Sequence, residues 1–252
     1  MGTVLIKIGG RAAENQESLG ALADEMAALS REQRVVLVHG GGAEVTALSQ
    51  RLGIEAVFKA GVRQTSPAEM DIVDMVLAGR VNSHLVRLFS ARGLAAVGLR
   101  GSDGGTIVGR ALGDTRTGEV ATVDTRLVEL LLGQGYVPIL CPTSTDGRGV
   151  GLNLNADTAA FALAGRLSAS ALVFLSDIPG VLSEGSVLQA LNAVEARALI
   201  ARGVISGGMV PKISASLEAM DQGVRKVIIG QYDGPGALGR LLEGRQGTRL
   251  WT

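Results

Sequence analysis

VLIKIGG (residues 4–10) and VVLVHGGG (residues 35–42) are apolar runs that end in glycines, with a helix-like segment between them. Neither run alternates apolar and polar residues, so each is expected to be a strand buried on both faces, as in a parallel sheet flanked by helices. Further runs of this kind begin at Ala95, Tyr136, Ala171 and Lys226. Because helix-like segments alternate with these runs, the sequence predicts right-handed crossovers and a doubly wound sheet.

Helical patterns occupy the intervals between the strands. They are predicted at residues 18–33, 43–52, 67–92, 124–133, 156–167, 194–201 and 211–221. The alternation indicates an α/β protein, a three-layer αβα sandwich with a mostly parallel central sheet. Residues 101–123 differ, because turn glycines and β-branched residues there predict a hairpin or a small antiparallel addition to the sheet. Residues 143–151 form another turn-rich segment.

The composition restricts the class of protein. Acidic and basic residues balance at 24 each and form no basic stripe, so nucleic acid is not expected as a partner. The single cysteine, Cys141, excludes an intramolecular disulfide, fits a reducing compartment and is expected to be structural. The sequence has no signal-peptide pattern after Met1 and no apolar run of about 20 residues, so a soluble cytoplasmic protein without a membrane partner is expected.

Glycine motifs end the first two predicted strands, KIGG at residues 7–10 and HGGG at residues 39–42. Consecutive glycine N–H groups can approach an anion closely, and a helix expected from Ala43 adds partial positive charge. Together the two loops predict one anion-binding mouth, although each alone is equally explained as a tight strand-to-helix turn. Neither motif is a Walker loop or a GxGxxG fingerprint, which disfavours a Rossmann dehydrogenase.

Lysine is rare in this chain, occurring only at Lys7, Lys59, Lys212 and Lys226, while arginine supplies the other basic residues. Lys7 lies in KIGG, and Lys212 ends the motif SGGMVPK in the first turn of a predicted helix, where its charge opposes the helix dipole. A nearby phosphate would explain both positions, because a compact ammonium suits a moving phosphoryl group. For Lys212 the simpler alternative is a solvated surface lysine.

The motif NLNAD (residues 153–157) leads into a helix and has two interpretations. Asn155 or Asp157 caps that helix. Alternatively, Asp157 holds the two lysines by charge-assisted hydrogen bonds. A cap explains only one of the three polar residues in the motif.

Two loops offer further candidate binding groups. SDIPGV (residues 176–181) directly follows a strand and is either a loop that holds a nucleotide or an ordinary turn. Arg63, in AGVR, is placed to bind a carboxylate or is a surface arginine. Thr65 or Ser66 then caps the next helix.

Taken in order, these motifs resemble the amino-acid kinase superfamily and, within it, the acetylglutamate kinases. The resemblance covers nearly the whole chain and is carried by KIGG, LVHGGG, AGVR, MVLAGRVN, AVGL, DGG, NLNAD, LSDIPGVL, ISGGMVPK and the terminal GTR. Each motif is weakly specific alone, whereas the ordered set is highly specific.

The resemblance implies ATP-dependent phosphorylation of the side-chain carboxylate of N-acetyl-L-glutamate to N-acetylglutamyl 5-phosphate, in arginine biosynthesis. It implies Mg²⁺ held mainly through the nucleotide phosphates, with no metal ligands from the chain. Lys7 and Lys212 would stabilise charge on the transferring phosphoryl group, and Asp157 would position them. The acceptor would be bound by Gly41, Gly42, Arg63 and Asn153. The nucleotide would be bound by Gly9, Gly10, Ser176, Asp177, Ile178, Pro179, Gly180, Val181, Val204, Ile205 and Ser206.

Residue chemistry agrees with such a reaction. A carboxylate acceptor is already ionised at neutral pH, so no general base is required. Phosphoryl transfer then depends on positioning and charge stabilisation, which lysines and glycine N–H groups supply. His39 is therefore expected to shape the glycine loop without transferring a proton.

The resemblance also implies an organisation. One domain, residues 1–252, would comprise an acceptor-binding and dimerisation lobe over about 1–170 and an ATP-binding lobe over about 171–252. Arginine-inhibited relatives carry an extra N-terminal helix, and Lys7 lies almost at the start of this chain, so a homodimer without strong arginine feedback is expected. The alternatives are a sister kinase acting on carrier-protein-linked aminoadipate or glutamate, and a catalytically silent nucleotide-binding sensor.

Overall fold

The structure is a computed structural model that describes residues 1–9, 16–59, 61–183 and 185–251. Gly10 lies outside the described residues, so its expected contact with the nucleotide stays a prediction.

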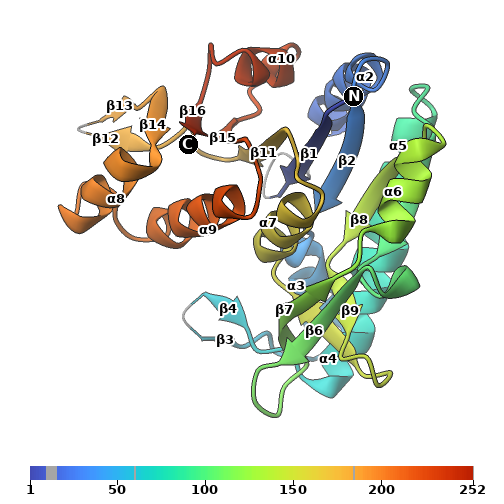
Figure 1. Ribbon diagram of the computed structural model, residues 1–252. Helices are drawn as coiled ribbons and strands as arrows, with labels where there is room; N and C mark the ends of the chain where they lie inside the picture. The colour runs from blue at the N-terminus through green and yellow to red at the C-terminus, as the bar shows by residue number, and fades with distance from the viewer. Residues whose placement is uncertain (10–15, 60, 184, 252) are drawn as a thin grey trace.

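An eight-stranded sheet in the order β14-β16-β15-β11-β1-β2-β8-β5 runs through the molecule (Figure 1). Its strands are β1 (Thr3–Ile8), β2 (Arg34–His39), β5 (Ala96–Arg100), β8 (Val137–Cys141), β11 (Ala171–Ser176), β14 (Ala190–Asn192), β15 (Lys226–Gln231) and β16 (Thr248–Trp251). All neighbours are parallel except β15 and β16. The six predicted strands are confirmed. Sequence reasoning missed β14 and β16 because they are too short to form an apolar run.

The helices follow the predicted intervals, except for α10 (Ala237–Leu242), which was not predicted. The others are α2 (Gln16–Leu29), α3 (Gly42–Arg51), α4 (Pro67–Val73), α5 (Asn82–Ser90), α6 (Arg126–Gly133), α7 (Ala156–Arg166), α8 (Ala193–Ala201) and α9 (Met209–Asp221). The single helix predicted at residues 67–92 is interrupted, because a π-helical segment, η1 (Asp74–Val81), joins α4 to α5. The sequence does not reveal the π segment, because the buried residues Val73, just before it, and Leu77 and Val81, within it, are spaced by four, as in an α-helix.

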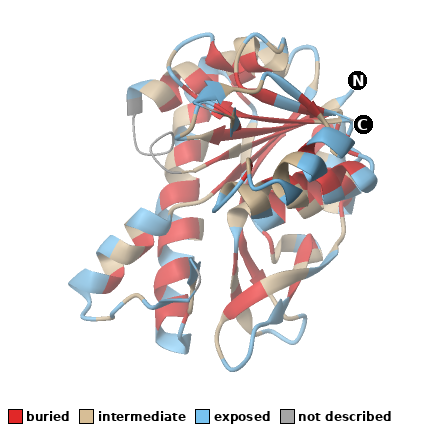
Figure 2. Ribbon diagram, turned by 90° about the vertical axis from the view of Figure 1, so that its left-hand side faces the viewer, coloured by how far each residue is buried: buried red, intermediate tan, exposed pale blue. Residues whose placement is uncertain are grey.

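Two hydrophobic cores lie on opposite faces of the sheet. Side chains of β1 alternate between them, with Val4, Ile6 and Ile8 in one core and Leu5 in the other. The first core packs α2, α4, η1, α5 and α10, and the second packs α6, α7, α8 and α9. Figure 2 shows the strands buried along much of their length, while the helices are buried on one side. The predicted three-layer sandwich is therefore confirmed.

A small barrel stands apart from the main sheet (Figure 1). Its strands β6 (Ile107–Ala111), β7 (Thr117–Val123), β9 (Thr143–Thr145) and β10 (Gly151–Leu154) pair in a closed order. The predicted hairpin is the antiparallel pair β6–β7, preceded by a 3₁₀ turn, η2 (Asp103–Gly105). It closes on β9 and β10 rather than extending the sheet. A Cβ at Gly118 would lie 2.8 Å from the Leu154 side chain, so glycine there leaves room for the barrel interior.

Register places the two glycine motifs together. β1 and β2 are parallel with Ile8 opposite His39, and the Gly40 N–H donates to the Ile8 carbonyl over 3.2 Å. The described part of KIGG, residues 7–9, and the HGGG motif therefore leave the sheet at the same edge, as predicted. Two short hairpins complete the fold, β3 (Phe58–Lys59) with β4 (Val62–Arg63), and β12 (Leu182–Ser183) with β13 (Ser186–Val187).

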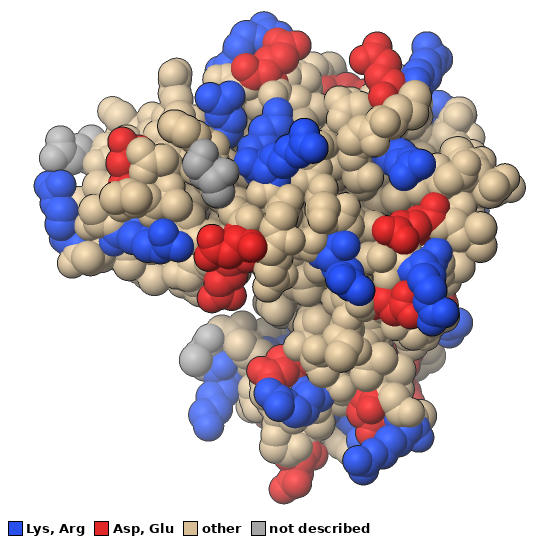
Figure 3. All heavy atoms as spheres, in the orientation of Figure 1, with Lys and Arg blue, Asp and Glu red and all other residues tan. Residues whose placement is uncertain are grey.

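Charge is mixed over the visible surface. On the face seen in Figure 3, acidic and basic side chains lie interspersed over both halves of the molecule. Within the part of the chain that the structure describes, no helix combines the length and apolar character needed to cross a membrane.

Candidate functional site

Lys7, Asp157 and Lys212 meet beyond the C-terminal ends of the central strands. Lys7 Nζ lies 2.6 Å from Asp157 Oδ1, and Lys212 Nζ lies 3.4 Å from Oδ2. These residues come from β1, from the first turn of α7 and from the first turn of α9. The fold thus brings the three predicted catalytic residues into one group, named here the ion triad.

Helix capping explains why Asp157 is available to the lysines. The Asn155 side chain accepts the N–H groups of Asp157 and Thr158 over 2.8 and 3.2 Å, and is therefore the N-cap of α7. The structure shows that Asn155, and not Asp157, caps the helix. Asp157 lies two residues further on, and its carboxylate pairs with the two ammonium groups.

The ion triad is mostly removed from solvent, with 13% of the Lys7 side chain, 28% of Asp157 and 19% of Lys212 exposed. Burial opposes ionisation of Asp157, but the charges of Lys7 and Lys212 outweigh it and hold the pKa of that carboxyl below its usual range. Apart from the ion pair with Lys7, Asp157 Oδ1 is buried without a hydrogen-bond partner among the described residues. Charge-assisted contacts with the two ammonium groups hold this carboxylate.

The surroundings of both lysines leave space for an ammonium group. The Lys7 side chain folds over Gly9, where an added Cβ would overlap Nζ and displace the ammonium group. Lys212 Nζ lies 5.4 Å from the centroid of the Phe174 ring in β11, a cation–π contact. The alternative of a solvated surface lysine at position 212 is therefore wrong.

The HGGG motif turns directly into α3. Gly41 has φ 151°, a conformation that side chains rarely adopt, and a Cβ there would lie 2.7 Å from Leu77. α3 begins at Gly42, and no side chain caps its N-terminus. Uncapped N–H groups at a helix start favour anions, so these glycines are candidates for anion binding.

Arg63 lies against this helix start. Its Nη1 donates to Glu69 over 2.7 Å, and its Nη2 donates to the Gly42 carbonyl over 3.0 Å and to Thr46 Oγ1 over 2.6 Å. The guanidinium also stacks 4.8 Å from the Phe58 ring centroid. Only 9% of its side chain is exposed, so Arg63 is not a surface arginine.

Asn153 is connected to Arg63 by hydrogen bonds through Thr65 and Thr117. Its amide donates to Thr65 Oγ1 over 2.9 Å. The Thr117 hydroxyl accepts the Thr65 N–H over 2.8 Å and donates to the Arg63 carbonyl over 2.6 Å. The predicted acceptor residues are thus connected. Because Thr65 is buried in this network, the cap of α4 is Ser66, whose Oγ accepts the Glu69 N–H.

Several of these neighbours were missed by sequence reasoning. Thr46, Glu69 and Thr117 are ordinary polar residues whose partners lie far away in the chain. The spacing of Ser66 and Glu69 is a capping-box pattern, which is the one available signal. It places Glu69 in a first helical turn but does not reveal its ion pair with Arg63.

The predicted nucleotide residues from Ser176 onward lie on the other half of the sheet. Ser176 ends β11, and the following loop is anchored where the Val181 N–H donates to Thr248 Oγ1 over 2.8 Å. Asp177 and Pro179 are exposed, Ile178 is half-buried and Gly180 is buried. Val204, Ile205 and Ser206 join α8 to α9, with only Ile205 fully buried. Both segments adjoin elements that meet where Lys212 contacts Phe174.

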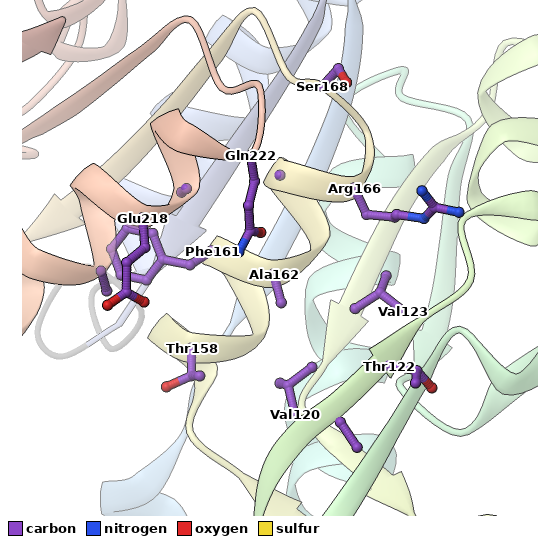
Figure 4. Close-up of a pocket in the computed structure, with 14 residues that line it drawn as sticks. Val120, Thr122, Val123, Thr158, Phe161, Ala162, Arg166, Ser168, Glu218 and Gln222 are labelled. Atoms are coloured by element: carbon purple, nitrogen blue, oxygen red, sulfur yellow. The ribbon is translucent and has the colours of Figure 1, made fainter. Parts of the chain in front are cut away.

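A cavity of about 630 Å³ opens between β7, α7 and α9. Figure 4 shows Glu218 on α9, Gln222 directly after that helix and Phe161 on α7, with Val120 and Val123 of β7 across from them. No member of the ion triad lines it. The cavity is therefore separate from the predicted catalytic residues.

His39 and Cys141 do not offer a nucleophile or base. Burial, chiefly, lowers the pKa of His39 to about 4, so the imidazole is neutral near pH 7. Burial raises the pKa of the Cys141 thiol, which lies 3.4 Å from Thr143 Oγ1. These surroundings support a structural cysteine.

Comparison with known proteins identifies the family and the fold. Residues 2–231 match the amino acid kinase family. The acetylglutamate kinase of Sinorhizobium medicae is 39% identical over 90% of this chain and 83% of its own length. That of Solidesulfovibrio magneticus is 40% identical over 90% and 82%. A crystal structure from Streptococcus mutans superposes with a TM-score of 0.81 at 26% identity, covering 99% of this chain and 98% of that one.

These features define an enzyme of the kinase class. The chain belongs to the amino acid kinase family and, within it, to the acetylglutamate kinases.

Proposed function

We propose that this enzyme transfers the γ-phosphoryl group of ATP to the side-chain carboxylate of N-acetyl-L-glutamate, forming N-acetylglutamyl 5-phosphate in arginine biosynthesis. The observation that carries the proposal is the ion triad, in which two largely buried ammonium groups share the Asp157 carboxylate. The identity of the acceptor rests on relatives named acetylglutamate kinase.

The acceptor is bound at the start of α3. Arg63 has five N–H donors, and its contacts to Glu69, Gly42 and Thr46 use three of them. Two donors remain for an acceptor carboxylate, beside the uncapped N–H groups of Gly41 and Gly42. Asn153, fixed by Thr65, supplies a further polar group. This arrangement favours a small free acid as the acceptor over a substrate attached to a carrier protein.

In the transfer step, an oxygen of the acceptor carboxylate attacks the γ-phosphorus, the bond to the β-phosphate oxygen breaks, and ADP leaves. Lys7 and Lys212 stabilise the negative charge on the transferring group. Asp157 holds both ammonium groups in place without taking a proton, since its pKa is held low. No general base is needed, in agreement with the neutral His39.

ATP is bound by Gly9, Gly10, residues 176–181 and residues 204–206. Mg²⁺ is carried mainly by the nucleotide phosphates, where it neutralises part of their charge. Among the described residues, no three or more His, Cys, Asp or Glu side chains gather where they could hold an ion. α9, like α3, starts without a side-chain cap, which favours phosphate at its N-terminus.

The organisation is proposed as a homodimer in the cytoplasm. Acceptor residues all precede position 170 and the main nucleotide loops follow 171, which supports an acceptor-binding lobe over about 1–170 and an ATP-binding lobe over about 171–252. One sheet spans both, since β1 pairs with β11. β5 ends the sheet among the described strands, and an edge strand can be covered by a second copy.

A hydroxylamine trap for acyl phosphate tests the function. With Mg-ATP and N-acetyl-L-glutamate the enzyme should yield the hydroxamate, and Lys212→Ala should yield far less. Parallel reactions contain carrier-linked aminoadipate or glutamate. Hydroxamate only from a carrier-linked acceptor would identify the sister activity. Tight ATP binding without any hydroxamate would identify a silent nucleotide sensor.

A further inference from the structure

The Asn82 side chain spans three neighbouring strands. It is the first residue of α5, follows the π-helical segment η1 and is buried. Its Nδ2 group lies 2.8 Å from the Ile139 carbonyl of β8 and 3.0 Å from His39 Nε2 of β2. Its Oδ1 lies where a Cβ on Gly98 of β5 would overlap it. The amide is therefore held by contacts to β2, β8 and β5, which are adjacent in the sheet.

These contacts determine which nitrogen of the His39 ring carries the proton. The Ile139 carbonyl can only accept, so the amide presents its NH₂ group there and to His39. His39 Nε2 must then be the unprotonated acceptor. The proton is on Nδ1, which donates to the Gly40 carbonyl over 2.8 Å. Asn82 thus selects one neutral tautomer of His39.

The tautomer has a consequence for Gly41. The Gly40 carbonyl and the Gly41 N–H belong to the same planar trans peptide and point in opposite directions. Holding the carbonyl through His39 therefore sets the direction of the Gly41 N–H. Among the turn, loop and cap hydrogen bonds of the described residues, none has the Gly41 N–H as donor to a backbone carbonyl.

The electrostatic surroundings favour the same state. Burial lowers the pKa of His39, its hydrogen bond to Gly40 opposes this, and the charge of Lys7 on β1 lowers it further. The groups that reach the ring from the other elements, Asn82 and the Gly40 carbonyl, are uncharged. A protonated ring would direct Nε2–H against the Asn82 NH₂ group, a donor facing a donor.

We propose that Asn82 is a positioning residue for phosphoryl transfer: through His39 it orients the Gly40–Gly41 peptide so that the Gly41 N–H is fixed for the acceptor. This inference rests on the proposed function, in which Gly41 binds the acceptor. It explains why the MVLAGRVN motif ends in a buried asparagine, and why a buried histidine that transfers no proton precedes the three glycines.

The first experiment measures the tautomer directly. The chain has two histidines, so ¹⁵N imidazole NMR of the full-length enzyme gives two ring systems, and His84→Gln assigns them. His39 should show protonated Nδ1 and bare Nε2, without titrating from about pH 5.5 to 8.5. Asn82→Asp places a carboxylate beside Nε2, so His39 should become protonated there. A wild-type His39 with protonated Nε2, or one that titrates in this range, would overturn the proposal.

The second experiment measures the consequence for catalysis. Asn82→Asp should lower kcat/KM for N-acetyl-L-glutamate by roughly tenfold to a hundredfold, because a donor misplaced by a fraction of an ångström loses much of its effect. The KM for ATP should stay within about twofold. His84→Gln, two positions along α5, should match the wild type in both constants. A changed tautomer with unchanged kcat/KM for the acceptor would refute the positioning role.

A second variant covers the case in which Asn82→Asp does not fold. Gly98→Ala retains the asparagine but pushes its amide aside, because the new Cβ overlaps Oδ1. It should alter the His39 tautomer and the acceptor constant in the same direction, and an unchanged acceptor constant despite a shifted tautomer counts against the proposal. If the wild-type enzyme does not phosphorylate N-acetyl-L-glutamate, the proposed function fails, while the NMR measurement still decides the Asn82–His39 relation.

Discussion

Replacing Asp157 by asparagine tests the ion triad most directly. The substitution keeps the shape of the side chain but removes the charge that Lys7 and Lys212 share at 2.6 and 3.4 Å. Two ammonium groups, both largely buried, then repel each other without a counter-ion. We expect a less stable protein, slower turnover and a stronger response to nucleotide.

The size of the effect follows from burial. Removing one partner of a fully buried ion pair costs about 3–5 kcal/mol. Since 28% of Asp157 is exposed, solvent screens part of the interaction, and a loss of about 2–3 kcal/mol is expected. For a chain of this size that lowers Tm by roughly 4–12 °C. The pKa of Asp157 is lowered, so its stabilisation is present at neutral pH and is lost only as pH falls through that lowered value.

Scanning calorimetry at pH 7, with and without Mg-ATP, measures this change. Mg-ATP should raise the Tm of Asp157→Asn more than that of the wild type, because the triphosphate replaces the missing negative charge. Turnover should fall by roughly a hundredfold. The matched control is Asp24→Asn, which breaks an exposed pair with Arg92 and should cost at most about 1 kcal/mol. An apo Tm for Asp157→Asn equal to that of the wild type would refute the reasoning.

Three further predictions concern single residues. Lys212→Ala should lower kcat by roughly 10²–10³-fold with a much smaller change in ATP affinity, and steady-state kinetics that show unchanged turnover would remove it from the mechanism. Glu69→Gln weakens the ion pair that holds Arg63, so the KM for N-acetyl-L-glutamate should rise by about tenfold while the KM for ATP stays constant; equal shifts in both would indicate a general structural effect. His39, with its pKa lowered to about 4 from 6.5, takes up a proton on unfolding, so the free energy of unfolding should fall as pH drops from 6.5 to 4, by up to about 1.4 kcal/mol per pH unit. Urea titrations should show a shallower pH dependence for His39→Gln, and an identical slope would contradict the neutral buried state.

The central strands and their glycine motifs could be predicted because their information is local. A continuous apolar run such as residues 4–8 has to be buried on both faces, and the glycines that follow mark its end. The same reasoning fails for β14 and α10, which have too few residues to show a pattern. It also fails for η1, because the four-residue spacing of its buried side chains also fits an α-helix.

The layered α/β fold, the common edge of the two glycine motifs and the residue types suited to phosphoryl transfer all follow from the order of residues in the chain. Alternatives that were equally plausible locally were resolved by contacts in the folded protein. In the folded protein, Asn155 caps the helix and Asp157 pairs with both lysines. Lys212 packs against Phe174, and Asn82 contacts His39 of the HGGG loop. The physical reason is that propensity and apolar period depend on neighbours in the chain, whereas ion pairs and side-chain hydrogen bonds depend on groups that only the folded sheet brings within 3–4 Å.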